Sequence, residues 1–521
     1  MYGFIMSYKI SVLAEDKIGE VFTPLEWAKW LISRWNLADK WFAGAAICDP
    51  TAGQGVFAMA LIDEAVHRRI SLTQGLLERL HLVELHKDHL DKFVENIRAR
   101  HSIDFPTSSL HACDVLFSPP RMQFDILVGN PPWSNFTDLP SHYKEVLKPL
   151  FIEYGLVPDR KAVLLGSSRT DLSALILKSV FSKLLKEGGE GFFFTPLSLY
   201  VGDDAHTGFR DFKTKEAQFS VREIIEFVDD RVFKGVGTSY CAAHFKRDEV
   251  QTYPVPYSRR IKGREESYTA RPLKLSTDPW RVVTDSEPDL DGIKIDICLS
   301  PEQKPRQGVN TCGANSIFIF DQYPDFIDSR FIFPLATKEI WKEESNVPRK
   351  WIFMPYDPTT GKPLSDREVR SIMGYSYLVK YEAELRQRKG TLINTSIGKG
   401  AWWALLGVGP YSFAPFKVIW QAFGKHTLDP IILDDLNGQP WQGNQAMHAF
   451  IPCWREEDAT RICRELKNPR IEKILGELNG QGKCNFAQPG KMKKLLSFDR
   501  EVTEQLTLLE PATEYRTRRR S

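Results

Sequence analysis

The sequence lacks the features of a membrane protein or of a protein from an oxidising compartment. Its eight cysteines are scattered over 521 residues, and none forms a Cys-x-x-Cys pair or a Cys/His ligand set. Neither a disulfide framework nor a structural zinc site is therefore expected. No apolar run approaches the ~18 residues of a membrane span, and the N-terminus is too polar for a signal peptide. These absences predict a cytoplasmic protein with no membrane partner.

The chain also has little net charge. Its 69 basic residues nearly balance 67 acidic ones, which leaves a formal charge of +2. Any nucleic-acid surface must then come from local clusters rather than from bulk charge. Hydrophobic residues at 42% and charged residues at 26% are typical of a soluble globular protein. The length exceeds one ordinary core, so two or three domains are expected.

The first 250 residues alternate between short apolar runs and segments with helical spacing. Strands are expected at 47–50, 79–85, 124–130, 190–196, 221–230 and 239–247, and helices at 56–69, 86–101, 171–189 and 209–218. The helix at 171–189 is expected to be amphipathic and to stop at its Gly-Gly pair. This alternation predicts an α/β domain with a mostly parallel sheet, helices on both faces, and ligands beyond the carboxyl ends of the strands.

The character of the sequence changes near residue 249. The stretch 253–272 is basic and broken by prolines, which favours a linker or a hairpin. From about residue 285, aromatic patches, glycines and short strands dominate, with a helix near 381–390. We therefore expect a second, irregular α+β domain. The predicted division is 1–248, a linker or hairpin region at 249–300, a second domain at 301–505, and a basic tail at 506–521.

A glycine-containing motif, Asp49-Pro50-Thr51-Ala52-Gly53-Gln54-Gly55, follows the first strand and opens a helix. Glycines there let the backbone turn tightly and pass close to a ligand. Alone, such a motif could equally serve a dinucleotide. Glu84 ends the next strand, where it could accept hydrogen bonds from ribose hydroxyls, or simply cap a helix. Asp114 follows another strand and could accept from an adenine amino group, or be a turn residue.

Thr23 and Pro24 come just before a further predicted helix. Thr23 is expected to be its N-cap and Pro24 its first residue. A helix N-terminus also favours an anionic group such as a ligand carboxylate. With the glycine motif, these residues suit a small zwitterion that carries a nucleoside. S-adenosylmethionine fits, whereas NAD would need a pyrophosphate cradle that this spacing does not supply well.

Five short motifs carry a family resemblance. Their order in the chain is Phe-Thr-Pro (22–24), the glycine motif (49–55), Val-Glu-Leu (83–85), Ala-Cys-Asp (112–114) and Asn-Pro-Pro-Trp (130–133). Over about residues 18–248 the chain resembles the gamma class of N6-adenine DNA methyltransferases of type II restriction-modification systems. The resemblance implies a Rossmann-like, S-adenosylmethionine-dependent catalytic domain. The cofactor-binding candidates are then Thr23, Pro24, Asp49, Pro50, Thr51, Gly53, Gly55, Glu84 and Asp114.

The Asn-Pro-Pro-Trp corner suits this chemistry. An adenine amino nitrogen is a poor nucleophile, and two acceptors on its N–H bonds favour a pyramidal nitrogen. The Asn130 side-chain oxygen and the Pro131 carbonyl can accept, while Pro131-Pro132 fixes the direction of that carbonyl. Trp133 offers a face on which a flipped base can stack, worth ~1–3 kcal/mol. A structural turn is the alternative. By the resemblance, Phe233 is a second aromatic against the base; otherwise it is a core residue.

Other chemistries find little support in the sequence. No cysteine follows a proline at this strand end, which disfavours cytosine-C5 methylation through a thiolate, and the reaction needs no metal. No nuclease motif is found, so a restriction endonuclease or another defence-system subunit would be a separate partner. The segments 306–320, 329–341, 377–390 and 446–454 more loosely resemble a target-recognition region. Arg306, Arg330, Lys399, Trp402 and Trp403 are candidates there for contact with duplex DNA, or else packing and solvated residues.

The expected function is site-specific methylation of adenine N6 in double-stranded DNA. The enzyme would act in a restriction-modification or defence system or as a solitary modification enzyme. An Asn-Pro-Pro corner can grip any planar NH2 group, so RNA adenine and a protein glutamine amide are alternative substrates. A non-catalytic DNA-binding subunit is a further alternative. The long C-terminal half favours DNA.

Overall fold

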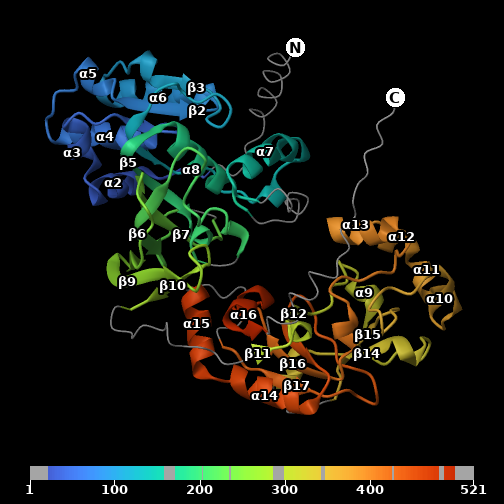
Figure 1. The fold of residues 1–521 in the computed structure, drawn as a ribbon. Coiled ribbons are helices and arrows are strands. Elements are labelled where there is room, and N and C mark those ends of the chain that lie inside the picture. The colour runs from blue at the N-terminus through green and yellow to red at the C-terminus, as the bar shows by residue number, and fades with distance from the viewer. Residues whose placement is uncertain are drawn as a thin grey trace, which may run out of the picture. The chain divides into compact units, whose positions relative to one another are not determined.

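The computed structural model describes residues 21–157, 170–201, 204–233, 236–284, 298–341, 347–424, 427–479 and 486–498. The chain divides into two compact units, Met1–Pro288 and Asp289–Ser521, both drawn in Figure 1. The predicted basic tail at 506–521 lies outside the described residues. Among the described helices, none is long and apolar enough to cross a bilayer.

A ten-stranded sheet organises the first unit, in the order β10-β9-β8-β6-β7-β5-β4-β1-β2-β3. The strands are β1 (Ile47–Asp49), β2 (Leu80–Glu84), β3 (Leu110–Ala112), β4 (Phe124–Gly129), β5 (Leu185–Pro196), β6 (Phe219–Phe227), β7 (Tyr240–Arg247), β8 (Val255–Ile261), β9 (Arg264–Pro272) and β10 (Trp280–Val283). From β3 to β5 all neighbours are parallel, whereas β7 runs antiparallel between β5 and β6. The strand order reverses at β1 and β4, which is where such sheets bind ligands.

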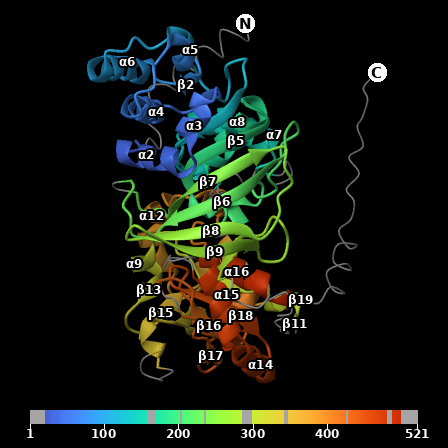
Figure 2. The ribbon, with the colours of Figure 1, turned by 90° about the vertical axis from the view of Figure 1, so that its left-hand side faces the viewer.

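Helices cover both faces of this sheet, because alternate side chains of each strand point to opposite sides. Ile126 and Val128 of β4 pack in one core with α2 (Leu25–Arg34), α3 (Leu37–Phe42), α4 (Val56–His67) and α6 (Lys87–His101). Leu127, between them, packs in the other core with α7 (Ser141–Glu153) and α8 (Leu172–Lys183). Figure 2 shows the strands β5, β7, β6, β8 and β9 one below the other, in their order in the sheet. The predicted α/β fold is confirmed.

The helix expected over 171–189 is shorter than predicted and is not amphipathic. α8 ends at Lys183, and the Gly188-Gly189 pair lies inside β5 instead of stopping the helix. Every residue of α8 from Leu172 to Ser182 is buried. Even Lys178 is enclosed, because its ammonium group donates to two backbone carbonyls and to the carboxylate of Asp211.

The helix expected over 209–218 does not form. The segment is a series of turns that ends in a bridge between Lys213 and Gln218. Phe209 and Phe212 are buried in the core, and the guanidinium of Arg210 donates to the carbonyls of Leu199 and Thr277. Burial of these large side chains therefore overrides the helical pattern of the sequence.

Residues 255–283, which the sequence suggests are part of a linker or hairpin, extend the sheet of the first unit. β8 and β9 form an antiparallel hairpin, β8 pairs in parallel with β6, and β10 pairs with β9. The rest of that predicted region includes 285–297, which lies outside the described residues.

The second unit is an irregular α+β arrangement. Its strands are β11 (Cys298–Leu299), β12 (Arg306–Gln307), β13 (Ile319–Phe320), β14 (Ile332–Leu335), β15 (Lys350–Phe353), β16 (Phe416–Gln421), β17 (Ile431–Leu433), β18 (His448–Cys453) and β19 (Ser497–Phe498). They form sheets in the orders β12-β18-β16-β17, β13-β15-β14 and β11-β19. The helices are α9 (Asn315–Phe318), α10 (Asp366–Ser371), α11 (Tyr375–Lys380), α12 (Glu382–Arg386), α13 (Thr391–Gly398), α14 (Glu456–Leu466), α15 (Pro469–Asn479) and α16 (Pro489–Leu495).

Two candidate DNA-contacting residues of this unit are core residues. Trp402 and Trp403 are 3% and 1% exposed and pack among its apolar side chains. The carbonyls of Trp402 and Ala404 accept hydrogen bonds from the buried guanidinium of Arg388. Because both indoles are covered, their role in this structure is packing.

Candidate active site

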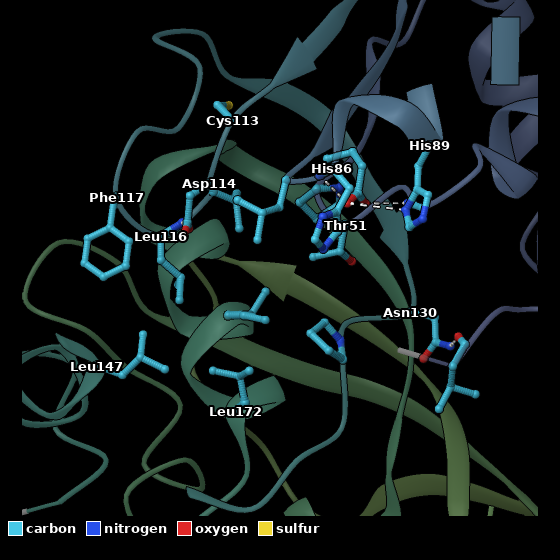
Figure 3. A pocket seen from close by; sticks show the side chains of 18 of the residues that line it. Thr51, His86, His89, Cys113, Asp114, Leu116, Phe117, Asn130, Leu147 and Leu172 are labelled. Carbon is cyan, nitrogen blue, oxygen red and sulfur yellow. Dashed lines mark hydrogen bonds and ion pairs between the residues drawn. The ribbon is translucent and has the colours of Figure 1, made fainter. Parts of the chain in front are cut away.

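Four predicted site residues meet at one edge of the sheet of the first unit. Asp49 and Glu84 are the last residues of β1 and β2, Asn130 comes directly after β4, and Asp114 is the second residue after β3. Because these strands are parallel, their carboxyl ends share this edge. A cavity lies there, and Figure 3 shows the labelled Asp114 and Asn130 on either side of Thr51 within it.

The glycine motif turns tightly against β2. Gly53 adopts φ +53° and donates its backbone N–H to Glu84 Oε2 over 2.7 Å. Gly55 adopts φ +69°, and a Cβ atom there would come within 2.7 Å of the Leu82 side chain. Both positions therefore need glycine. Gly53 lines the cavity, whereas Gly55 lets the turn pack against the core.

Glu84 is 9% exposed, and its carboxylate accepts hydrogen bonds from the loop that follows β1 and from the loop that follows β2. Oε2 accepts from Gly53, and Oε1 accepts from the backbone N–H of His86 over 2.9 Å. Each carboxylate oxygen can accept a second hydrogen bond, so Glu84 can still bind ligand hydroxyls. Asp114 is held in a similar way, since its Oδ1 accepts from the Leu116 N–H over 2.8 Å. Burial raises the pKa of Asp114.

Asp49 is the most enclosed carboxyl group of the site, with 4% of its surface exposed. Oδ1 accepts from the N–H of Thr51 over 3.1 Å. Among the described residues, Oδ2 has no hydrogen-bond partner, and neither has the buried Thr51 Oγ1. Burial raises the pKa of Asp49 to about 8, and the charge of Glu84 adds to the rise. Such enclosed, unsatisfied polar atoms indicate a ligand that completes them.

The Asn130 side chain has a fixed orientation. Its Nδ2 donates to the carbonyl of Val21 over 3.0 Å and to Thr23 Oγ1 over 3.2 Å. A backbone carbonyl can only accept, so the NH2 group must face Val21. Oδ1 is therefore on the other side of the amide. It is buried and has no partner within the described part of the chain.

The N-cap predicted at Thr23 is wrong. α2 starts at Leu25, its N-cap residue is Pro24, and no side chain caps it. The Thr23 hydroxyl accepts from Asn130 instead, so a contact from the end of β4 replaces the local cap. Thr23 lines a second cavity beside the first, and Asn130 lines both. Pro24 lines neither of them.

Trp133 is half-buried and packs against two other aromatic side chains. Its ring meets Phe233 edge to face, with 5.0 Å between centroids, and lies 5.8 Å from the ring of Tyr240. Phe233 is only 3% exposed. The Tyr240 hydroxyl donates to the Asp230 carbonyl and accepts from the Val232 N–H. Tyr240 thus fixes the turn that carries Phe233, a role that the sequence did not reveal.

The apolar end of the cavity comes from residues that sequence reasoning missed. Tyr143 and Leu147 reach it from α7, and Leu172 and Ile176 from α8. Leu85, His86 and His89 line another part. The first two directly follow Glu84 at the end of β2, so their place in the chain was a usable signal. The α7 and α8 residues gave no such signal, because they resemble any core leucine or isoleucine.

The arrangement defines a class. Together these features form a Rossmann-like methyltransferase domain. They are the strand order, the antiparallel β7, the glycine turn after β1, the acidic residues at the ends of β2 and β3, and the Asn-Pro-Pro-Trp corner after β4. Residues 72–233 match the family model described as the Eco57I restriction-modification methylase. This part of the chain is therefore a methylase domain of a restriction-modification family.

Solved structures give a weaker likeness. The Type IIL restriction-modification enzyme MmeI in complex with DNA has a TM-score of 0.49 at 11% identity, over 82% of this chain and 60% of that one. A nuclease-deletion mutant of the Type ISP restriction-modification enzyme LlaGI, with a DNA substrate mimic, has a TM-score of 0.48 at 13% identity, over 83% and 48%. A modification subunit of a putative type I restriction enzyme from Vibrio vulnificus YJ016 has a TM-score of 0.33 at 15% identity, over 50% and 51%.

The chain thus spans about half to three-fifths of the length of these structures. Compared by sequence, no curated protein matches the chain.

Proposed function

We propose that the chain is a site-specific DNA methyltransferase that flips an adenine out of the duplex and methylates its N6 with S-adenosylmethionine. The observation that carries the proposal is the orientation of Asn130. Its NH2 group is held by Val21 and Thr23, and its buried oxygen has no partner among the described residues. An acceptor held in this way suits an incoming N–H bond better than a freely rotating amide does.

The cofactor fits the residues around the cavity. S-adenosylmethionine would supply an activated methyl group on a sulfonium. Glu84 and Asp114 would bind its ribose hydroxyls and adenine amino group, and the unpaired Oδ2 of Asp49 would accept from its ammonium group. Pro50, Thr51, Gly53 and Gly55 would shape the backbone around the ligand.

In the reaction, the two acceptors hold the amino group of the target base. Asn130 Oδ1 and the Pro131 carbonyl each accept one N–H, and this leaves the nitrogen lone pair to face the methyl carbon. The bound cofactor would give up its methyl group and leave as a neutral thioether, and the methylated nitrogen would release its extra proton to water. Pro132 restricts the corner, and Trp133 would hold the extruded ring by stacking. Phe233 would join it after its ring is uncovered.

The second unit would read the DNA sequence. The best described candidate surface is the cluster of Lys304, Arg306 and Lys493. Partial burial and the charges of Arg306 and Lys304 together lower the pKa of Lys493, so these three cations lie close enough to repel one another. DNA phosphates would relieve that repulsion. Lys399 is also exposed, at the end of α13.

The test is methyl transfer from labelled S-adenosylmethionine to unmethylated duplex DNA, to RNA and to protein, followed by mass spectrometry of the nucleosides. We expect N6-methyladenine in the duplex and none with Asn130→Ala. N4-methylcytosine, or label only in RNA or protein, would reject the proposal. Single-molecule sequencing of the methylated DNA would then give the recognition motif. A partner nuclease, and a role in defence, would be tested by co-purification and by phage challenge.

A further inference from the structure

Thr23 stands between the catalytic amide and the second cavity. Its Oγ1 lies 3.2 Å from Asn130 Nδ2, from which it accepts a hydrogen bond. The residue is 9% exposed and lines the second cavity together with Asp49, Thr51 and Gly53. A threonine hydroxyl can accept and donate at the same time. After it has accepted from Asn130, its own proton is the group left for a ligand.

That proton has no acceptor among the described residues. Two independent features indicate a polar ligand there, and the first of them favours a negatively charged group. The hydroxyl is two residues before the first residue of α2, a helix of ten residues whose N-terminal N–H groups favour negative charge. In the same cavity, the buried Asp49 Oδ2 and Thr51 Oγ1 have no hydrogen-bond partner among the described residues, and such atoms indicate a polar ligand.

We propose that Thr23 is a positioning residue that couples cofactor binding to the orientation of Asn130. The inference rests on the proposed function. The cofactor carboxylate would accept from the Thr23 hydroxyl, Thr23 Oγ1 would accept from Asn130 Nδ2, and Asn130 Oδ1 would accept from the target amino group. Successive hydrogen bonds polarise one another, so each end of this chain strengthens the other.

Without the cofactor, the one hydrogen bond that holds the Thr23 hydroxyl among the described residues is the bond that it accepts from Asn130. Val21 then remains the second anchor of the amide, at 3.0 Å, and one anchor restrains its rotation less than two. Cofactor binding fixes the hydroxyl, the hydroxyl fixes the amide, and the amide presents its oxygen to the base. The enzyme should therefore bind its target base better after its cofactor, and the coupling must be reciprocal.

The experiment measures this coupling. The duplex carries the recognition motif found by sequencing, with an unmodified adenine at the target position, and the probe for the cofactor site is sinefungin, which carries no methyl group to transfer. The Kd of the duplex is measured with and without sinefungin for the full chain, for Thr23→Val and for Thr23→Ser. Thr23→Val keeps the shape and removes the hydroxyl, whereas Thr23→Ser is the matched control that keeps it. Thermal unfolding checks that each variant is folded.

We expect sinefungin to tighten duplex binding about tenfold in the unchanged chain, within the usual 5- to 150-fold range of such coupling. The effect should be similar in Thr23→Ser and less than twofold in Thr23→Val. At saturating cofactor, Thr23→Val should also slow single-turnover methylation about tenfold. In an Asn130→Ala background, Thr23→Val should leave the sinefungin effect unchanged. The hydrogen-bond relay from the cofactor through Thr23 to Asn130 is already broken there, because the Asn130 amide is missing.

A Thr23→Val variant that only weakens cofactor binding, with normal coupling and a normal single-turnover rate, would make Thr23 a plain cofactor contact and overturn the relay. Equal losses in Thr23→Ser and Thr23→Val would do the same. If Thr23→Val does not fold, Thr23→Ala is used with the same readouts. The proposed function fails on a different result, namely no N6-methyladenine in duplex DNA with the unchanged chain.

Discussion

The rings of Trp133 and Phe233 meet edge to face, with an angle of 83° between their planes. This contact, with those of Phe194 and Tyr240, covers Phe233, which is 3% exposed, so of the two rings Trp133 is the one that presents aromatic surface. A base that enters the site must either stack on Trp133 alone or separate the two rings. The wall that is proposed to hold the flipped base is thus closed in the structure.

Removal of the Trp133 ring should weaken base flipping. Because stacking of a base on an aromatic side chain contributes ~1–3 kcal/mol, we expect Trp133→Ala to raise the Kd for the target duplex by about 5- to 150-fold. The fluorescence of 2-aminopurine at the target position should fall in parallel. Trp133→Phe keeps a stacking face and should retain most of both signals. Unchanged fluorescence in Trp133→Ala would contradict the stacking role.

Truncation of Asn130 should affect turnover far more than cofactor binding. The loss of one preorganised hydrogen-bonding group at a reacting atom typically costs about 10²- to 10³-fold in kcat, and we expect that loss for Asn130→Ala. The Kd of sinefungin, from calorimetry, should rise no more than the tenfold that the coupling through Thr23 allows. Asn135→Ala is the control in the same loop, since within the described residues the Asn135 side-chain amide donates only to the nearby Asp138. A comparable kcat loss in that variant would argue against the role of Asn130.

Asp49 should make the first unit less stable as the pH rises. Its pKa is raised from 3.8 to about 8 in the folded chain, so the folded state binds more protons than the unfolded state between those values. Stability then falls with increasing pH across this window. We expect Asp49→Asn to raise the Tm by several degrees at pH 9 and by little at pH 4, as measured by calorimetry.

The same Asp49→Asn variant should bind S-adenosylmethionine at least tenfold more weakly, because a neutral amide replaces the proposed partner of the ammonium group. A gain in Tm of the same size at every pH would show that the Asp49 carboxyl does not titrate as proposed. This opposition of stability and binding is typical of functional sites.

The cations of the second unit should differ in their effect on DNA binding. Lys493 is exposed and lies near two other cations, whereas the guanidinium of Arg330 is bound by the Asp328 carboxylate over 2.7 Å. We expect Lys493→Gln and Arg306→Gln each to lower the salt dependence of log Kd by about 0.9 for every phosphate that the variant no longer neutralises. Arg330→Gln should change it little. Binding titrations at several salt concentrations would distinguish these cases, and equal effects of all three variants would reject the proposed cluster.

Much of the first unit was predictable because its signals are local. Each apolar run that ends in a polar or turn residue became a strand, as 79–85 and 124–130 show, with β2 and β4 inside them. The residues after those runs then met at one edge, since parallel strands share their direction. The candidates Asp49, Glu84, Asp114 and Asn130 came together for that reason.

The failures have a common physical cause, which is contact between distant parts of the chain. Thr23 looked like a helix cap, but its hydroxyl is used by Asn130, 107 residues away in sequence. The segment 209–218 has helical spacing, yet burial of its phenylalanines decides its shape. The apolar residues of α7 and α8 could not be assigned to a cavity, because a pocket wall and a core look alike in sequence.

One property of the pocket bears on engineering. Leu147 and Leu172, which form part of its apolar wall, lie on two helices, whereas Glu84, Asp114 and Asn130 lie at or just after the ends of strands. Shortening Leu147 to alanine should therefore open a hole without disturbing Asn130. A cofactor analogue with a bulky alkyl substituent on its purine could then serve the altered enzyme alone. Sites modified by the proposed activity would then be tagged apart from those of other methylases in the same cell.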